Sequence, residues 1–271
     1  MRSEFGMRHD PSKIYMMPLL GGMVVDSKGG VPYRERQIIA LQYLTTSRNI
    51  ERLLPDCYLS GDKPVVTASF AYNDGVDFMK GRGYRIATVS VSARHEGKRG
   101  TTEGGFIVVM YEDDTLPIIA GRELLGVPKL YGDISDPRIM PDGKIRCDVS
   151  LWGSLLFGVE VEPMSRQPEG VVEAMNQKPR GAPMLGYKYI HAMDGEPDCS
   201  YPVATPSDTT YREVWSGRKG KIFYGDPEEE DVGFHRSILD AVKSLEVRQV
   251  LGVSRSYSSS MLRVDLARRL E

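Results

Sequence analysis

The most informative stretch of this chain reads Gly121-Arg122-Glu123-Leu124-Leu125-Gly126-Val127-Pro128-Lys129-Leu130, and it follows the apolar run Leu116-Pro117-Ile118-Ile119-Ala120. Lysine is normally kept at the surface because burying an ammonium group is costly. Burial of Lys129 would disfavour its charged form and leave a neutral amine. A neutral amine attacks ketones, which is the basis of Schiff-base catalysis. The alternative is a lysine whose stem lies on apolar surface while its ammonium group reaches water.

The pattern Gly-Arg-Glu-x-x-Gly-x-Pro-Lys over residues 121–129 resembles the signature of the acetoacetate decarboxylase family, in which the lysine after the proline forms the Schiff base. Further similar segments are Tyr33-Arg34-Glu35-Arg36, Ile50-Glu51-Arg52-Leu53-Leu54-Pro55, Met110-Tyr111-Glu112-Asp113-Asp114 and Arg212-Glu213-Val214-Trp215-Ser216-Gly217. Because their order and rough spacing match from about residue 30 to about residue 262, the chain is identified as a member of this family.

Two positions depart from the family pattern. Family decarboxylases carry a second lysine directly after the Schiff-base lysine, where this chain has Leu130. They also carry a glutamate two residues after a tyrosine, and the matching segment Gly83-Tyr84-Arg85-Ile86 places Ile86 there. Without an adjacent ammonium group, burial, or a cation such as Arg36 brought close by folding, must favour the neutral form of Lys129.

The resemblance implies a lyase that acts on a small keto acid through a lysine Schiff base, most simply by decarboxylating a β-keto acid such as acetoacetate. Loss of the carboxylate at Ile86 gives nearly equal weight to an aldolase–dehydratase that uses the same imine of pyruvate or a related keto acid. A third hypothesis is a non-catalytic barrel that uses Lys129 and Arg36 only to bind a small anion.

The resemblance also assigns the residues of the expected site. Lys129 is the nucleophile, Arg36 binds the substrate carboxylate through its forked guanidinium group, and Tyr84 donates a proton or holds a substrate oxygen. The expected substrate-binding residues are Arg36, Ile86, Val127 and Leu130. The structural alternatives are an ion pair between Arg36 and Glu35, and a Tyr84 that only packs in the core.

Residue patterns predict many strands and few helices. Strands are expected over residues 37–46, 65–72, 84–93, 105–111, 144–151, 155–162, 187–192, 212–215, 221–224 and 247–253. Helices are expected after an N-cap at Ser47, as one turn over residues 122–125, and over residues 169–177 and 234–245. This indicates a mainly β (α+β) fold, and the resemblance implies a closed antiparallel β-barrel with an interior cavity. Residues 1–271 are expected to form a single domain, with about residues 1–30 as an N-terminal extension.

Composition sets the remaining expectations. A formal net charge of −2 gives no field that would attract nucleic acid or an anionic membrane, and no apolar run approaches the length of a membrane span. Three widely spaced cysteines and four histidines without ligand spacing predict neither disulfides nor a metal site, and they fit a cytoplasmic protein. We therefore expect no cofactor, a small keto acid as the partner and, by family analogy alone, a homo-oligomer.

Overall fold

The structure, a computed structural model, describes residues 13–17, 24–26, 29–178 and 181–271. Within these ranges the chain is mainly β-structure, as the strand-rich sequence predicts. A twelve-stranded sheet, a five-stranded sheet and the ribbon of β1 (Lys13–Tyr15) and β2 (Val24–Asp26) make up its strands. The helices are α1 (Ser47–Glu51), α2 (Thr115–Leu125), α3 (Glu169–Asn176), α4 (Glu229–Val232) and α5 (His235–Lys243), with 3-10 turns η1 (Asp77–Met79) and η2 (Val264–Leu266). No helix in these ranges has both the length and the apolar character needed to cross a membrane.

The twelve-stranded sheet forms the body of the molecule. Its main path runs β13-β16-β18-β3-β5-β6-β7-β14-β15-β19, while β4 pairs with β6 and β8 with β7. Neighbours are antiparallel except at β7, which pairs in parallel with β8 and β14. The strands are β3 (Val31–Leu44), β4 (Leu59–Ser60), β5 (Val65–Val76), β6 (Tyr84–Gly97), β7 (Gly100–Glu112), β8 (Lys129–Tyr131), β13 (Ser165–Arg166), β14 (Met184–His191), β15 (Pro197–Thr205), β16 (Ser207–Gly217), β18 (Gln249–Leu262) and β19 (Arg268–Arg269).

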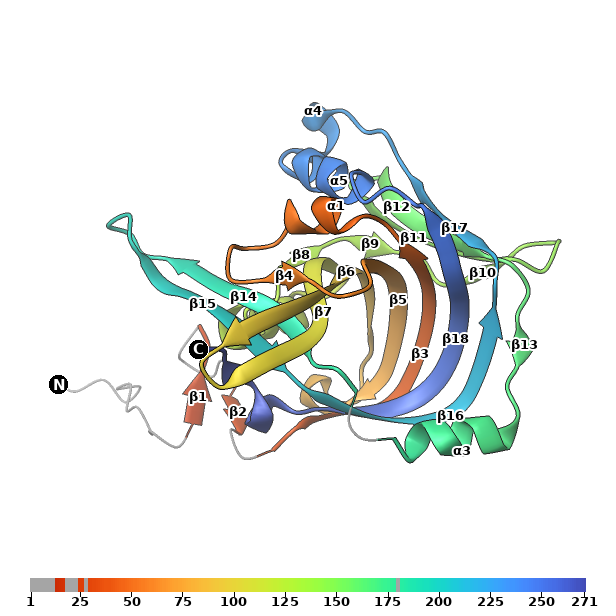
Figure 1. The fold of residues 1–271 in the computed structure, drawn as a ribbon, viewed down its shortest axis with the longest axis horizontal. Coiled ribbons are helices and arrows are strands. Elements are labelled where there is room, and N and C mark those ends of the chain that lie inside the picture. The colour runs from red at the N-terminus through yellow and green to blue at the C-terminus, as the bar shows by residue number, and fades with distance from the viewer. Residues whose placement is uncertain (1–12, 18–23, 27–28, 179–180) are drawn as a thin grey trace.

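This sheet curls strongly without closing on itself (Figure 1). Within the described ranges its end strands β13 and β19 each pair with one neighbour, so the mainly β fold is confirmed and the expected closed antiparallel barrel is not. The attachment of β14 gives the physical reason. Only two parallel residue pairs, Met184 with Gly105 and Leu185 with Phe106, join β14 to β7, and the β14–β15 hairpin extends away from the curled sheet.

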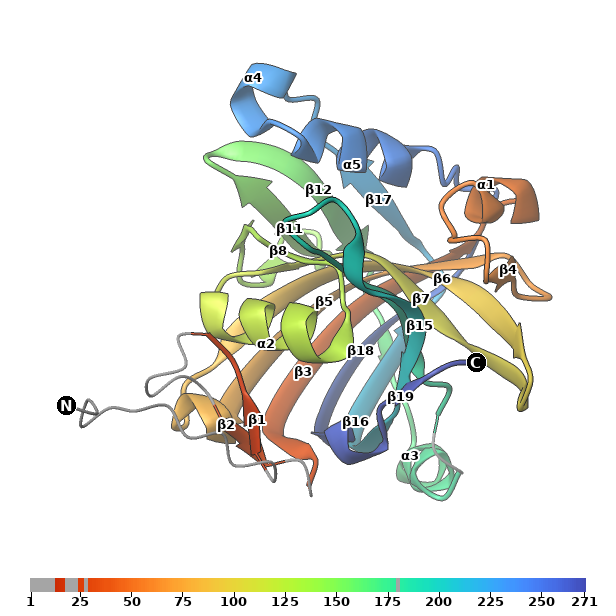
Figure 2. The ribbon, with the colours of Figure 1, turned by 90° about the vertical axis from the view of Figure 1, so that its left-hand side faces the viewer.

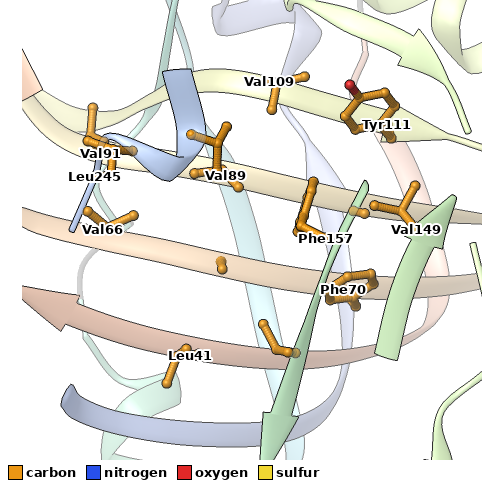
Figure 3. Close-up of a cluster of buried hydrophobic side chains, with 14 of the residues drawn as sticks. Leu41, Val66, Phe70, Val89, Val91, Val109, Tyr111, Val149, Phe157 and Leu245 are labelled. Carbon is orange, nitrogen blue, oxygen red and sulfur yellow. The ribbon is translucent and has the colours of Figure 1, made fainter. Parts of the chain in front are cut away.

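One face of the curled sheet packs against the five-stranded sheet to form the main hydrophobic core (Figure 3). The five strands are β9 (Asp133–Ile134), β10 (Arg138–Ile139), β11 (Ile145–Leu151), β12 (Ser154–Val161) and β17 (Gly220–Tyr224). Phe70 and Tyr111 of the large sheet meet Phe157 of β12, with ring centroids 6.0 and 6.2 Å from that of Phe157. Burial of each such ring stabilises the fold by about 1.5–3 kcal/mol, so this core holds the large sheet in its curved shape.

The opposite, concave face carries a second cluster and faces helix α2 (Figure 2). Successive strand residues point to opposite faces, so Ile86 and Met110 reach this second cluster whereas Ala87 and Tyr111 belong to the main core. Helix α2 covers the open side of the curve with Leu125 buried beneath it. The concave face is thus the place where side chains can surround an enclosed space.

Two helix boundaries differ from the sequence expectation. Thr46 rather than Ser47 caps α1, because its side chain accepts the backbone N–H of Asn49. Helix α2 has eleven residues rather than one turn, since Asp114 caps it and Pro117 lies in its first turn, where a proline needs no N–H partner. The single-domain boundaries stay a prediction, and most of residues 1–30 lies outside the described residues.

Candidate active site

Lys129 is the first residue of strand β8, directly after the turn that ends helix α2. Gly126 ends the helix in the left-handed conformation, with φ of 67°, and its N–H donates to the carbonyl of Gly121. Parallel pairing then sets Lys129 beside Met110 of β7. Arg122 Nη1 donates to the Lys129 carbonyl over 3.0 Å, so the helix and the strand are tied together at the lysine.

The Lys129 ammonium group is buried and faces a carboxylate. Only 9% of the residue is exposed, so the alternative of an ammonium group that reaches water does not hold. Its Nζ lies 2.8 Å from Oε1 of Glu112 and donates to the Pro117 carbonyl over 3.0 Å. Glu112 is fully buried, and among the described residues this ion pair is its only polar side-chain contact. Glu112 was not expected from the sequence, and it is the group closest to the amine.

Burial and pairing act on Glu112 in opposite directions. Burial raises the pKa of this carboxyl group, and the neighbouring Lys129 partly offsets the rise. A buried carboxylate with a raised pKa is a stronger base than one in water. It lies within hydrogen-bond distance of the proton that Lys129 must lose before it can attack a carbonyl.

Lys129 lies at the junction of two cavities. We call the first, of about 250 Å³, the polar chamber, and the second, of about 340 Å³, the apolar chamber. Lys129, Tyr33, Leu125 and Leu262 line both. The polar chamber is also lined by Arg36, Ser69, Tyr84, Ile86, Thr88, Ser90, Ile107, Met110, Glu112, Val127, Met184, Thr205, Ser207 and Ser260. The apolar chamber is also lined by Gly29, Gly30, Val31, Pro32, Asp77, Phe78, Pro117, Ala120, Gly121, Leu124 and Val264.

A β-bulge in β3 brings Arg36 into the polar chamber. Opposite β18, Tyr33 pairs with Ser260 and Arg36 with Ser258, so three steps along β3 match two along β18. The extra residue puts Tyr33 and Arg36 on the same face, which strict alternation would not do. Glu35 instead forms an ion pair with Arg212 on β16.

The guanidinium group of Arg36 has hydrogen-bonding capacity to spare. Its Nη1 donates to Ser260 Oγ over 3.4 Å, and its buried Nε has no partner among the described residues. No carboxylate in the described part of the chain lies within ion-pair distance of it, so the alternative pairing with Glu35 does not occur. Because Arg36 lines the polar chamber without a carboxylate partner among the described residues, its guanidinium group can bind an anion there.

Two tyrosines complete the polar chamber. The hydroxyl groups of Tyr33 and Tyr84 are 2.9 Å apart, and burial raises the pKa of both phenols. Both therefore stay protonated at neutral pH, and one can donate to a ligand while accepting from the other. The Tyr84 hydroxyl is satisfied by Tyr33 rather than by the backbone, and Tyr33 is a second residue that the sequence interpretation missed.

The structure gathers five of the six expected site residues around one chamber. Ile86 and Val127 are buried in the wall of the polar chamber with Lys129, Arg36 and Tyr84. Leu130 lines neither chamber and packs against the main core, because neighbouring residues of a strand point to opposite faces. A contact between Leu130 and the substrate therefore stays a prediction, which its position outside both chambers does not support.

Strand register places a carboxylate directly opposite Ile86. Ile86 of β6 is the direct cross-strand partner of Glu112 of β7, and both line the polar chamber. A signal for Glu112 existed in the sequence, since it stands two residues after Met110 and thus on the same strand face. The segment over residues 110–114 was noted in the sequence only for its resemblance to the family. In the described part of the chain, no three His, Cys, Asp or Glu side chains form a candidate metal site.

Comparison with known proteins assigns the chain to a family. The profile of the family "Acetoacetate decarboxylase (ADC)" matches residues 17–269. The chain belongs to the acetoacetate decarboxylase family. Acetoacetate decarboxylase 3 of Mesorhizobium japonicum is 28% identical to the chain over 192 residues, which cover 68% of the chain and 69% of that protein. Acetoacetate decarboxylase 1 of Bradyrhizobium diazoefficiens is 27% identical over 190 residues, covering 69% of the chain and 71% of that protein.

Solved structures share the fold at low sequence identity. A structure described as that of an acetoacetate decarboxylase superposes with a TM-score of 0.73 at 18% identity, covering 94% of this chain and 93% of the other. The enduracididine biosynthesis enzyme MppR complexed with pyruvate gives a TM-score of 0.69 at 17% identity, covering 95% and 97%. An acetoacetate decarboxylase-like enzyme from Sphingomonas wittichii gives 0.67 at 19% identity, covering 95% and 98%.

Proposed function

We propose that this member of the acetoacetate decarboxylase family is a lyase that forms a Schiff base between Lys129 and a keto acid, and that it decarboxylates a β-keto acid. The observation that carries the proposal is the buried Lys129 Nζ, 2.8 Å from Glu112 Oε1, in the wall of a chamber that also holds Arg36. A nucleophile, a base for its proton and an anchor for a carboxylate are thus gathered at one cavity.

The proposed reaction begins with proton transfer within the Lys129–Glu112 pair. Glu112 accepts a proton from Lys129, and the neutral amine adds to the ketone. Glu112 then returns this proton to the hydroxyl group of the adduct, so water leaves and a protonated imine remains. The imine draws the electron pair of the bond to the carboxylate, so carbon dioxide leaves and an enamine remains. Glu112 takes up a proton from solvent and passes it to the enamine carbon, which restores a protonated imine. Hydrolysis of this imine releases a ketone and restores Lys129. The net change converts a β-keto acid anion and one proton into a ketone and carbon dioxide.

In this proposal, Arg36 and the tyrosine pair bind the carboxylate and the ketone oxygen of the substrate. The guanidinium group of Arg36 lines the polar chamber and suits a contact to the substrate carboxylate. The Tyr33–Tyr84 pair can donate a hydrogen bond to the ketone oxygen as it leaves as water, because raised pKa values keep both phenols protonated.

The aldolase–dehydratase hypothesis uses the same imine and remains the second candidate. Ile86, which stands where family decarboxylases carry a glutamate, favours it. MppR, a neighbour in fold alone, was solved with pyruvate and with a condensation product of pyruvate and an aldehyde. Glu112 argues for the decarboxylase, since a carboxylate occupies the cross-strand position beside Ile86. The decarboxylase therefore stays the first proposal.

Borohydride reduction tests the Schiff base directly. The protein is incubated with acetoacetate or pyruvate, reduced and digested, and we expect the mass of the reduced adduct on the peptide that contains Lys129. Lys129→Ala should give no adduct. Lys221→Met, which removes an exposed lysine paired with Glu160, should label as the wild type does. Carbon dioxide release separates the decarboxylase from the aldolase, whose product keeps the carboxylate. Absence of an adduct with every keto acid would leave only the anion-binding hypothesis.

Replacement of Gly121 by alanine should displace the Lys129 side chain. A Cβ at Gly121 would stand 2.7 Å from Lys129 Nζ and even closer to the end of the aliphatic stem, which is nearer than atoms in contact can approach. Displacement of about 1 Å costs on the order of a hundredfold in rate, so we expect kcat/KM to fall by about that factor. Gly170→Ala is the matched control, because a Cβ there meets nothing within 4 Å. Unchanged activity in Gly121→Ala would show that the amine does not act from its observed position.

A further inference from the structure

Lys129 separates two chambers of different chemistry. On one side, the polar chamber combines Arg36, the tyrosine pair and hydroxyl groups such as Ser260 with apolar side chains. On the other side, the apolar chamber is walled by aliphatic and aromatic side chains, among them Phe78, Leu124 and Val264. A molecule bound covalently to Lys129 Nζ therefore has one direction in which a charged group is bound and another in which hydrocarbon is.

The polar character of the first chamber limits what can extend into it. Arg36 Nε and Glu112 Oε2 are both buried without hydrogen-bond partners among the described residues. A hydrocarbon chain in this chamber would displace water from the charged and hydroxyl groups that line it, which costs binding free energy. A carboxylate can form hydrogen bonds with the guanidinium group of Arg36, and it occupies little space. The carboxylate of the substrate therefore belongs in this chamber, and the rest of the molecule must lie elsewhere.

The apolar chamber is built to take that remainder. Its one acidic lining residue, Asp77, accepts a hydrogen bond from Arg34 Nε over 3.0 Å and is therefore occupied. The chamber volume of about 340 Å³ reaches the range of small-molecule pockets, about 300–1,000 Å³. Acetoacetate carries only a methyl group on the far side of its carbonyl carbon, so it would leave most of this space unfilled.

We propose that the substrate is a β-keto acid with an extended apolar group on the carbonyl carbon, such as an unbranched alkyl chain, which lies in the apolar chamber while its carboxylate contacts Arg36. This inference rests on the proposed Schiff-base function and adds the substrate class. The imine carbon sits at Lys129, its carboxymethyl arm enters the polar chamber and its alkyl arm enters the apolar chamber. Decarboxylation then releases carbon dioxide and a methyl ketone that keeps the alkyl chain.

A chain-length series tests this assignment with the full-length protein. Acetoacetate, 3-oxohexanoate and 3-oxooctanoate are compared by initial rates of carbon dioxide release, after subtraction of the spontaneous reaction. Burial of one methylene group is worth about a fourfold change in binding. We therefore expect kcat/KM to rise about fifteenfold from acetoacetate to 3-oxohexanoate, which adds two methylene groups, and to rise further for 3-oxooctanoate.

A variant that fills the chamber should reverse this preference. Ala120 of α2 lines the apolar chamber and not the polar one, so Ala120→Leu is expected to lower the kcat/KM ratio of 3-oxooctanoate to acetoacetate about tenfold or more. Val264→Phe fills the same space from another element and guards against misfolding of the first variant. Ala174→Leu, at an exposed position of α3, is the matched control and should leave the ratio unchanged.

The outcomes separate this inference from the proposed function. A rise with chain length that Ala120→Leu and Val264→Phe remove supports it. Adducts at Lys129 and carbon dioxide release with a flat or falling profile overturn the substrate class and leave the Schiff-base function standing. Adducts without carbon dioxide from any β-keto acid overturn the decarboxylase proposal and this inference together. Absence of adducts removes both at the first step.

Discussion

Glu112→Gln is expected to lower kcat for decarboxylation by about 10²- to 10⁴-fold, the range for loss of a general base. The amide keeps the shape of the side chain but cannot accept the proton of the Lys129 ammonium group, which lies 2.8 Å away. Loss of this proton precedes attack on the ketone, so formation of the borohydride-trappable adduct should slow by a similar factor. Rapid-quench reduction of the imine measures that step separately from carbon dioxide release.

The pH dependence provides a second readout for Glu112. Burial raises the pKa of this carboxyl group, and a base acts only when it is deprotonated. The wild-type kcat/KM should therefore decline as pH falls through a value above the ordinary range of glutamate, about 4.3. In Glu112→Gln this acidic limb should disappear. Glu123 of α2 lines neither chamber, so Glu123→Gln is the matched control. This variant should keep the wild-type rate and the wild-type decline at low pH. A Glu112→Gln enzyme with wild-type rate and acidic limb would assign the base to another group.

Lys129→Met is expected to lower the free energy of unfolding at pH 8 by about 3–5 kcal/mol, the usual cost of leaving one member of a buried ion pair without its partner. Lys129 lowers the pKa of Glu112, so its removal leaves burial as the main influence and the pKa rises further. A carboxyl group whose pKa is higher in the folded than in the unfolded state stabilises the fold when protonated. That stabilisation is complete at low pH and is lost as pH rises through the folded-state value.

The instability of Lys129→Met should thus grow as pH rises above the ordinary glutamate value of about 4.3, with a slope of up to about 1.4 kcal/mol per pH unit. Urea unfolding at several pH values measures it. The double variant Lys129→Met/Glu112→Gln removes the charge that causes the slope and should be nearly independent of pH over this range. If the single and double variants have parallel pH profiles, the Lys129–Glu112 pair does not carry the buried charge that we assign to it.

Much of the fold and the central residue of the site can be predicted from the chain. Alternating β-forming segments predict a mainly β protein, and short-range motifs locate most strands and helices. Closure of the sheet could not be predicted, because it depends on how β14 attaches to β7, and two residue pairs make that contact. The length of α2 was underestimated, because residues 116–120 were considered only as an apolar run, although the first turn of a helix tolerates Pro117.

The partners of Lys129 escaped prediction for a different reason. Glu112 meets the lysine only because β7 and β8 pair in parallel, and it stands beside Ile86 only through the register of β6 and β7. Tyr33 and Arg36 share a face because of a bulge that neither residue type signals. Leu130 was assigned to the site from its place next to Lys129, yet strand alternation turns it toward the main core.

Local chemistry was therefore readable along the chain: a buried lysine after a proline, an arginine for an anion and a strand-rich architecture. Folding added the carboxylate that faces the amine, the tyrosine pair, and the division of the interior into a polar and an apolar chamber with Lys129 between them. The physical reason lies in distance along the chain. A motif of ten residues sets the backbone around Lys129, whereas the groups that surround its Nζ come from segments whose meeting depends on strand register, a bulge and the position of α2 across the curved sheet.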